Sequence, residues 1–206
     1  LTRLYGPESF GMLATFASIL ALLNVVSSLR YELAIAVPED DEEAVKLVWL
    51  CFALVAISTG LTALGVLLIG DQLADLLHQP SLKPMLWLLP VGILLTGVYQ
   101  PLSYWSIRRK QFGLLAKTKV LQSIFAFVSN IVFFPYGAIG LTIGPVASAS
   151  VGTFQILGIK SNTSLRLPFS RPSETAVKFF SRSTLRLIAR YSNISFYNSI
   201  AGIANS

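Results

Sequence analysis

Six of the ten acidic residues of this chain lie in one short window, SLRYELAIAVPEDDEEA, at residues 28–44. Five of them follow Pro38 directly as the run Glu39–Glu43, and the sixth, Glu32, lies two positions after Arg30. Proline is favoured at the first position of a helix, and the helix dipole stabilises negative charge in the first turn. The window therefore predicts a helix that starts at Pro38. Direct binding of a partner or substrate by these acids remains the alternative.

The chain offers few residues for metal or covalent chemistry. It has one histidine, His78, and one cysteine, Cys51. A His/Cys metal cluster needs several such ligands, and a disulfide within the chain needs a second cysteine. We therefore expect no metal site, no cofactor and no enzymatic activity.

Composition and charge-free runs predict an integral membrane protein. Hydrophobic residues make up 53% of the chain and charged residues only 13%, whereas a soluble domain carries about 25% charged residues. Asp, Glu, Lys and Arg are absent from residues 9–29, 47–70, 84–107 and 120–159. A spanning helix needs about 20 apolar residues, and the turn sequence PYGAIG at 135–140 divides the longest run.

An all-α membrane protein with five spanning helices follows from these runs. Runs of this length without alternation favour helices over the short strands of a barrel. The spans are expected at about 10–29, 47–69, 85–106, 118–135 and 140–159.

Lysine and arginine predict the orientation of these spans. Fourteen of the 16 fall on one side of the five spans, and only Arg3 and Lys83 fall on the other. Positive residues favour the cytoplasmic side. The acidic window, the RRK loop at 108–110 and a basic segment at 160–190 are therefore expected in the cytoplasm, with Arg30 and Glu32 at the level of the lipid head groups. The net charge of +6 then reflects membrane insertion rather than nucleic-acid binding.

Both ends of the sequence predict a partial chain. It begins at Leu1 with LTRLYGP, which is typical of the tail of a preceding helix, and a new segment begins near Tyr191. We expect residues 1–206 to be a partial transmembrane lobe, with 191–206 as the start of a further helix.

Several stretches together resemble one transporter family. They are LTRLYGPESFG, SLRYELAIAVPEDDEEA, the WSIRRKQFGLLAK loop from Trp105 to Lys117, and GAIGLTIGPVASASVG. This pattern is similar to the N-terminal part of bacterial polysaccharide or O-antigen flippases, the oligosaccharide flippases of the multidrug/oligosaccharidyl-lipid/polysaccharide exporter superfamily. The resemblance covers essentially the whole chain and implies the N-terminal lobe of a MATE-like two-lobed transporter, without the second lobe.

The resemblance also implies a function in cell-surface polysaccharide biosynthesis. Such a protein would move an undecaprenyl-pyrophosphate-linked oligosaccharide across the bacterial inner membrane, with the head group in a cationic cavity. Membrane lipids and glycan assembly proteins would be further partners. Arg30 would bind the pyrophosphate at the cytoplasmic mouth. The polar groups of the cavity would be Arg3, Asn24, Gln100, Tyr104 and Asn130.

Three alternatives remain. A glycan polymerase or ligase would need a large outer loop with reactive residues, and the outer loops here are short. A drug/cation antiporter of the same superfamily would need a carboxylate within a span, and the five predicted spans contain none. A scaffold without transport activity is the third alternative.

Overall fold

The computed structural model describes residues 5–76, 83–158 and 189–192. Over these residues the chain is helical and contains no strand, which confirms the predicted all-α fold. The elements are α1 (Pro7–Ser27), η1 (Tyr31–Ala36), α2 (Asp41–Leu76), α3 (Lys83–Leu86), α4 (Leu88–Arg108), α5 (Phe112–Val132), η3 (Phe134–Tyr136) and α6 (Gly137–Gly158).

The acidic run does start a helix, three residues later than the predicted start at Pro38. Helix α2 begins at Asp41, and Asp41, Glu42 and Glu43 occupy its first turn. The carboxylate of Asp40 accepts a hydrogen bond from the backbone N–H of Glu42 at 3.1 Å. A side-chain oxygen that satisfies a free N–H at a helix start stabilises that start, so the helix begins after Asp40 rather than at the proline.

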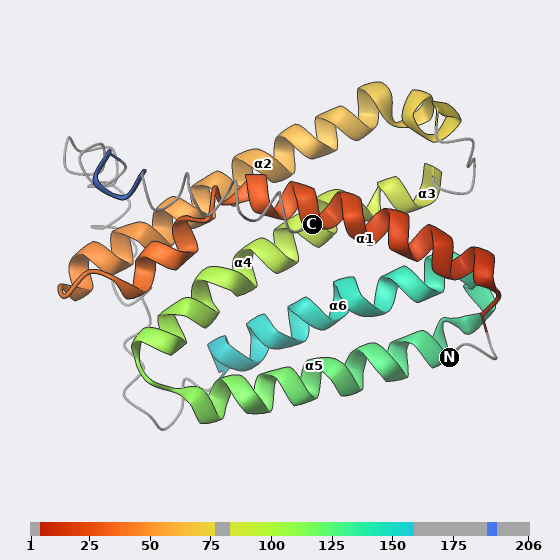
Figure 1. Ribbon diagram of the computed structural model, residues 1–206. Helices are drawn as coiled ribbons and strands as arrows, with labels where there is room; N and C mark the ends of the chain where they lie inside the picture. Colours follow the sequence, from red (N-terminus) through yellow and green to blue (C-terminus); the bar gives the residue numbers. More distant parts are fainter. Residues whose placement is uncertain (1–4, 77–82, 159–188, 193–206) are drawn as a thin grey trace.

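Consecutive long helices run in opposite directions, and their connections gather at two ends of the bundle (Figure 1). One end holds residues 28–40 and the tight connection between α4 and α5. The opposite end holds the start of α1, helix α3 and the η3 turn. Helix α4 lies in the middle, where it packs against α1, α2, η1 and α6, and α6 packs in turn against α5.

Four helical segments of the described part are long and apolar enough to cross a membrane: Pro7–Ser27, Asp41–Gln72, Phe112–Val132 and Phe134–Ile156. They correspond to four of the five predicted spans. The third predicted span forms α3 and α4 and is not among them. Polar residues and Pro101 lower the hydropathy of the second half of α4, which lies inside the bundle.

Close contact between α2 and α4 depends on a glycine. A Cβ atom added at Gly97 would lie 2.6 and 2.7 Å from the two methyl carbons of Val55. Interfaces between membrane helices use small residues so that the backbones approach closely. Gly97 therefore fixes the position of α4, the helix that contributes most of the candidate site.

The outward faces of α2 and α5 are strongly apolar. The exposed large side chains include Leu61, Leu64, Leu67, Leu68 and Ile69 on α2, and Val120, Ile124, Phe127, Val128 and Val132 on α5. An apolar surface of this extent is unusual for a protein in water, and lipid is the solvent that suits it. The chain is a membrane protein.

Candidate functional site

A strained turn links α1 to η1 at the first end of the bundle. Leu29 and Arg30 both adopt positive φ angles, of 48° and 59°. Residues other than glycine seldom adopt this left-handed conformation, so the surrounding structure must hold the turn in place. The turn directs the chain from α1 into η1 and sets the position of Arg30.

Glu32 is buried inside the protein, which the sequence did not predict. It is 2% exposed, and the hydroxyl of Ser28 donates a hydrogen bond to its Oε2 atom at 2.5 Å. Glu32 is buried because η1 packs against α2 and α4. A buried carboxylate therefore exists near the helix ends, although none lies within a predicted span.

Arg30 lies near the buried end of α4. Its Nε atom is shut off from solvent and has no hydrogen-bond partner among the described residues. Arg30 and Glu32 are both close enough to Tyr104 of α4 for their charges to act on its hydroxyl. An arginine nitrogen that is desolvated without a partner can be stabilised by an anionic ligand.

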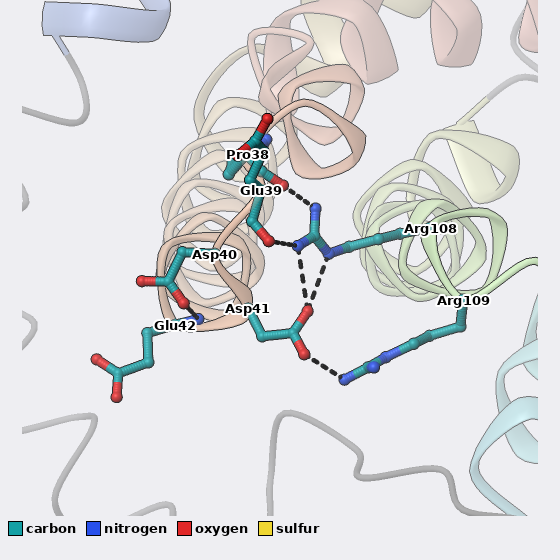
Figure 2. A network of polar contacts seen from close by, with 7 residues as sticks. All are labelled: Pro38, Glu39, Asp40, Asp41, Glu42, Arg108 and Arg109. Carbon is teal, nitrogen blue, oxygen red and sulfur yellow. Dashed lines mark hydrogen bonds and ion pairs between the residues drawn. The ribbon is translucent and has the colours of Figure 1, made fainter.

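A second arginine, Arg108, joins the acidic window to the end of α4 (Figure 2). Its Nη1 atom donates to the carbonyl of Pro38, and its Nη2 atom donates to the carbonyl of Glu39 at 3.0 Å. The same guanidinium contacts Oδ1 of Asp41, with the Nη2 atom at 3.1 Å. This network gives the acidic window a structural role in closing one end of the bundle.

Arg109 completes this network. Its Nη2 atom donates to Oδ2 of Asp41 at 2.9 Å, and its guanidinium carbon lies 5.0 Å from the centre of the Trp105 ring. Asp41 thus bridges two consecutive arginines of the RRK loop (Figure 2). Because Arg108 and Arg109 are both engaged by the carboxylate of Asp41, we do not assign them to ligand binding.

A cavity of about 460 Å³ lies between α4, α5 and α6. It extends along α4 from Thr96 to Ile107, the residue before Arg108. Eight of its eleven described lining residues carry a polar group on the side chain: Thr96, Tyr99, Gln100, Ser103, Tyr104, Lys119, Gln122 and Ser148. Apolar lining comes from Ile107, Pro145 and Ala149. A polar cavity inside an apolar helical bundle can bind a hydrophilic ligand within the membrane.

The opposite end of the bundle carries its own polar contacts. The Tyr5 hydroxyl donates to the backbone carbonyl of Asn130 at 2.6 Å. The Lys83 ammonium pairs with Asp71 at 3.2 Å and with Asp75 at 3.6 Å, and its hydrogen bond to Asp71 raises the pKa of Lys83. These contacts fasten helix ends, and their described residues are not among those that line the cavity.

A model of the polysaccharide biosynthesis protein family matches residues 1–204. The chain belongs to this polysaccharide biosynthesis protein family. No curated protein and no solved structure matches the chain significantly.

In this polysaccharide biosynthesis protein, four of the six predicted site residues lie at or near the cavity. Gln100 and Tyr104 line the cavity together. Asn24 lies beside it, because its Oδ1 atom accepts a hydrogen bond from the cavity residue Thr96 at 2.7 Å. Arg30 acts on the cavity residue Tyr104 from the nearby turn.

The remaining two predicted residues do not join this group. Asn130 is buried where α5 packs on α6, and a Cβ atom added at Gly144 would overlap its side-chain oxygen. It therefore packs between helices and does not line the cavity. Arg3, the sixth predicted residue, lies outside the described residues.

Sequence reasoning missed the contribution of α5 and α6 to the cavity. Lys119 and Gln122 are three residues apart and so share a face of α5, and both line the cavity. This spacing was a usable signal. Lys119 instead counted only toward the positive charge of a cytoplasmic loop, because it lies at the very start of the predicted span 118–135.

Proposed function

We propose that this membrane protein of polysaccharide biosynthesis is a flippase for a lipid-linked oligosaccharide. It would act in the bacterial inner membrane as a multi-pass protein, with the arginine-rich end of the bundle in the cytoplasm. The head group of an undecaprenyl-pyrophosphate-linked oligosaccharide would enter the cavity, and its lipid tail would remain in the bilayer. The observation that carries this proposal is the polar cavity between α4, α5 and α6 in a bundle with apolar outer faces.

The composition of the cavity wall supports transport of a sugar. Amide and hydroxyl groups such as those of Gln100, Ser103 and Ser148 exchange hydrogen bonds with sugar hydroxyls in place of water. This exchange lowers the barrier that hydrocarbon presents to a hydrophilic head group. Arg30, with a desolvated Nε atom near the cavity, would bind the pyrophosphate at the cytoplasmic mouth.

The same wall argues against a membrane enzyme of the pathway. A glycan polymerase or ligase needs a general base or acid within reach of its substrate. The described residues that line the cavity include no carboxylate and no histidine. We therefore propose binding and release, without covalent chemistry, as the role of these side chains.

The buried Glu32 is the one observation that favours a drug/cation antiporter. A desolvated carboxylate could bind a proton or a cation. The cavity wall, however, carries the ammonium of Lys119 and no carboxylate, which disfavours a cationic substrate. We therefore retain the anionic lipid-linked glycan as the proposed substrate.

Deletion of the gene tests the proposal in cells. We expect surface polysaccharide to fall and the lipid-linked oligosaccharide to accumulate on the cytoplasmic leaflet. Resistance to cationic drugs should stay unchanged. A deletion strain with normal surface polysaccharide would contradict the flippase, and hypersensitivity to cationic drugs would favour the antiporter.

A further inference from the structure

Lys119 is the one cationic side chain among the described residues that line the cavity. Its ammonium lies 5.0 Å from the centre of the Tyr99 ring, over its face, and it forms no ion pair within the described part of the chain. An aromatic face stabilises an ammonium only modestly. The charge therefore remains available to an anion that enters the cavity.

Tyr99 adds an unsatisfied polar group beside this ammonium. The side chain is 7% exposed, and its hydroxyl is shut off from solvent with no hydrogen bond of good geometry, although the Gln122 amide approaches it. A buried hydroxyl without a partner is unfavourable. Because Tyr99 lines the cavity, a ligand oxygen that displaces the neighbouring Gln122 amide could accept this hydrogen bond.

Gly152 of α6 allows this arrangement. A Cβ atom added there would lie 2.7 Å from Cε2 of Tyr99 and would overlap the amide nitrogen of Gln122. Any larger residue at this position must displace both side chains. The absence of a side chain at Gly152 therefore leaves the space in which Tyr99 and Gln122 lie beside Lys119 in the cavity wall.

We propose that Lys119 and Tyr99 form an anion-binding subsite inside the cavity, separate from Arg30. The inference rests on the proposed function, and its ligand is an anionic oxygen group of the transported head group, either a phosphate or a sugar carboxylate. Lys119 lies about 10 Å along α5 from the helix start at Phe112, given the rise of an α-helix. The subsite is therefore further from the arginine-rich end of the bundle than the start of α5, although the Lys119 side chain is itself exposed.

Direct binding measurements on the purified full-length protein test this subsite. The probes are geranylgeranyl pyrophosphate with its neutral counterpart geranylgeraniol, and a disaccharide containing glucuronic acid with its neutral counterpart containing glucose. We expect Lys119→Gln to weaken binding of at least one anionic probe by roughly tenfold to a hundredfold, the range for a charge-assisted hydrogen bond. Binding of the neutral counterparts should stay unchanged.

Three further variants distinguish a loss of the subsite from a nonspecific effect of changing charge on α5. Lys119→Arg should retain most of the affinity, and Tyr99→Phe, which keeps the ring, should weaken the same probe less than Lys119→Gln does. Lys117→Gln is the matched control, because this exposed lysine lies two residues away on α5 and does not line the cavity. It should leave every affinity unchanged.

The outcomes identify the source of the anion. Weaker binding of the pyrophosphate alone assigns the subsite to the carrier lipid, and weaker binding of the glucuronate alone assigns it to an acidic sugar. Unchanged affinity of Lys119→Gln for both anions would overturn the inference, as would an equal effect of Lys117→Gln or no preference of the wild type for either anion. The gene deletion described above tests the flippase independently, since it does not depend on Lys119.

Discussion

Arg108 and Asp41 join the end of α4 to the start of α2 and are 67 residues apart in the sequence. The Nε and Nη2 atoms of Arg108 donate to the same Oδ1 atom of Asp41, at 3.3 and 3.1 Å. The Arg108 side chain is 12% exposed, whereas that of Asp41 is 53% exposed. Most of the guanidinium is therefore removed from water, and its contacts with the backbone carbonyls of Pro38 and Glu39 must replace the lost hydration.

Arg108→Ala should destabilise the protein more than Arg109→Ala. The first change deletes a largely buried guanidinium and leaves the backbone carbonyls of Pro38 and Glu39 without their donor. We expect it to lower the free energy of unfolding by about 2 kcal/mol or more. The second deletes a more exposed ion pair with Asp41 and a contact with the Trp105 ring. We expect it to lower the free energy of unfolding by about 1 kcal/mol or less. Thermal unfolding in detergent measures both variants. Equal losses of stability would show that the backbone contacts of Arg108 contribute little.

Gly97→Ala should weaken the contact between α2 and α4. The new methyl group would meet Val55, whose branched side chain has little freedom to move in a helix. Overpacking of this kind costs roughly 1–3 kcal/mol. Thermal unfolding should show the loss, and a second change, Val55→Ala, should restore part of it.

Gly60→Ala is the matched control for Gly97→Ala. An added Cβ atom at Gly60 meets nothing within 4 Å, although the residue lies in the middle of α2. Alanine favours a helix over glycine by about 1 kcal/mol. Gly60→Ala should therefore be neutral or stabilising, and a loss as large as that of Gly97→Ala would refute the steric explanation.

Cysteine labelling in intact cells tests the orientation. Single cysteines replace Tyr136 at one end and Lys110 at the other, in a Cys51→Ala background, and both positions are exposed. A membrane-impermeant thiol reagent should modify the cysteine at position 136 and spare the one at position 110, because the basic end faces the cytoplasm. Permeabilised cells should allow both to react. The reverse pattern in intact cells would invert the topology.

Arg30→Lys should keep normal protein levels and lose most polysaccharide export. Lysine can anchor a helix end as arginine does, but it lacks the planar fork that binds two phosphate oxygens at once. The loss of head-group capture should be roughly tenfold to a hundredfold. Surface polysaccharide relative to protein level is the measurement.

Neutralisation of Glu39 and Asp40 provides the control for Arg30→Lys. The structure uses the carbonyl of Glu39 and the capping oxygen of Asp40, which Glu39→Gln and Asp40→Asn both preserve. Export should remain largely intact in this double variant. Normal export by Arg30→Lys would reduce Arg30 to an anchor of the turn.

The fold could be predicted well from the sequence because the bilayer imposes simple length and charge rules. Charge-free runs located every long helix, and the turn sequence at 135–140 corresponds to η3 and to Gly137, whose φ angle is 59°. The positions at which helices start were predicted less accurately. The Asp40 cap moved the start of α2, and η1 occupied a stretch that has no distinct sequence pattern.

The candidate site could be predicted only in part, since it depends on how helices rotate against each other. Gln100 and Tyr104 are four residues apart on one face of α4, so they line the cavity together. Asn130 and Lys119 both lie on α5, yet only Lys119 faces the cavity. Close contacts at Gly144 and Gly152 of α6 set how α5 is rotated about its own axis. The local sequence does not reveal which helix packs against these glycines.

Translocation of a lipid-linked oligosaccharide in proteoliposomes tests the central claim most directly. The full-length protein is reconstituted with a fluorescently labelled undecaprenyl-pyrophosphate oligosaccharide, and an impermeant quencher reports which leaflet holds the head group. The account predicts rapid exchange of the head group between leaflets for the wild type, and slow exchange for Arg30→Lys and Lys119→Gln. Exchange no faster than in protein-free vesicles, with protein that is folded and correctly inserted, would contradict the account.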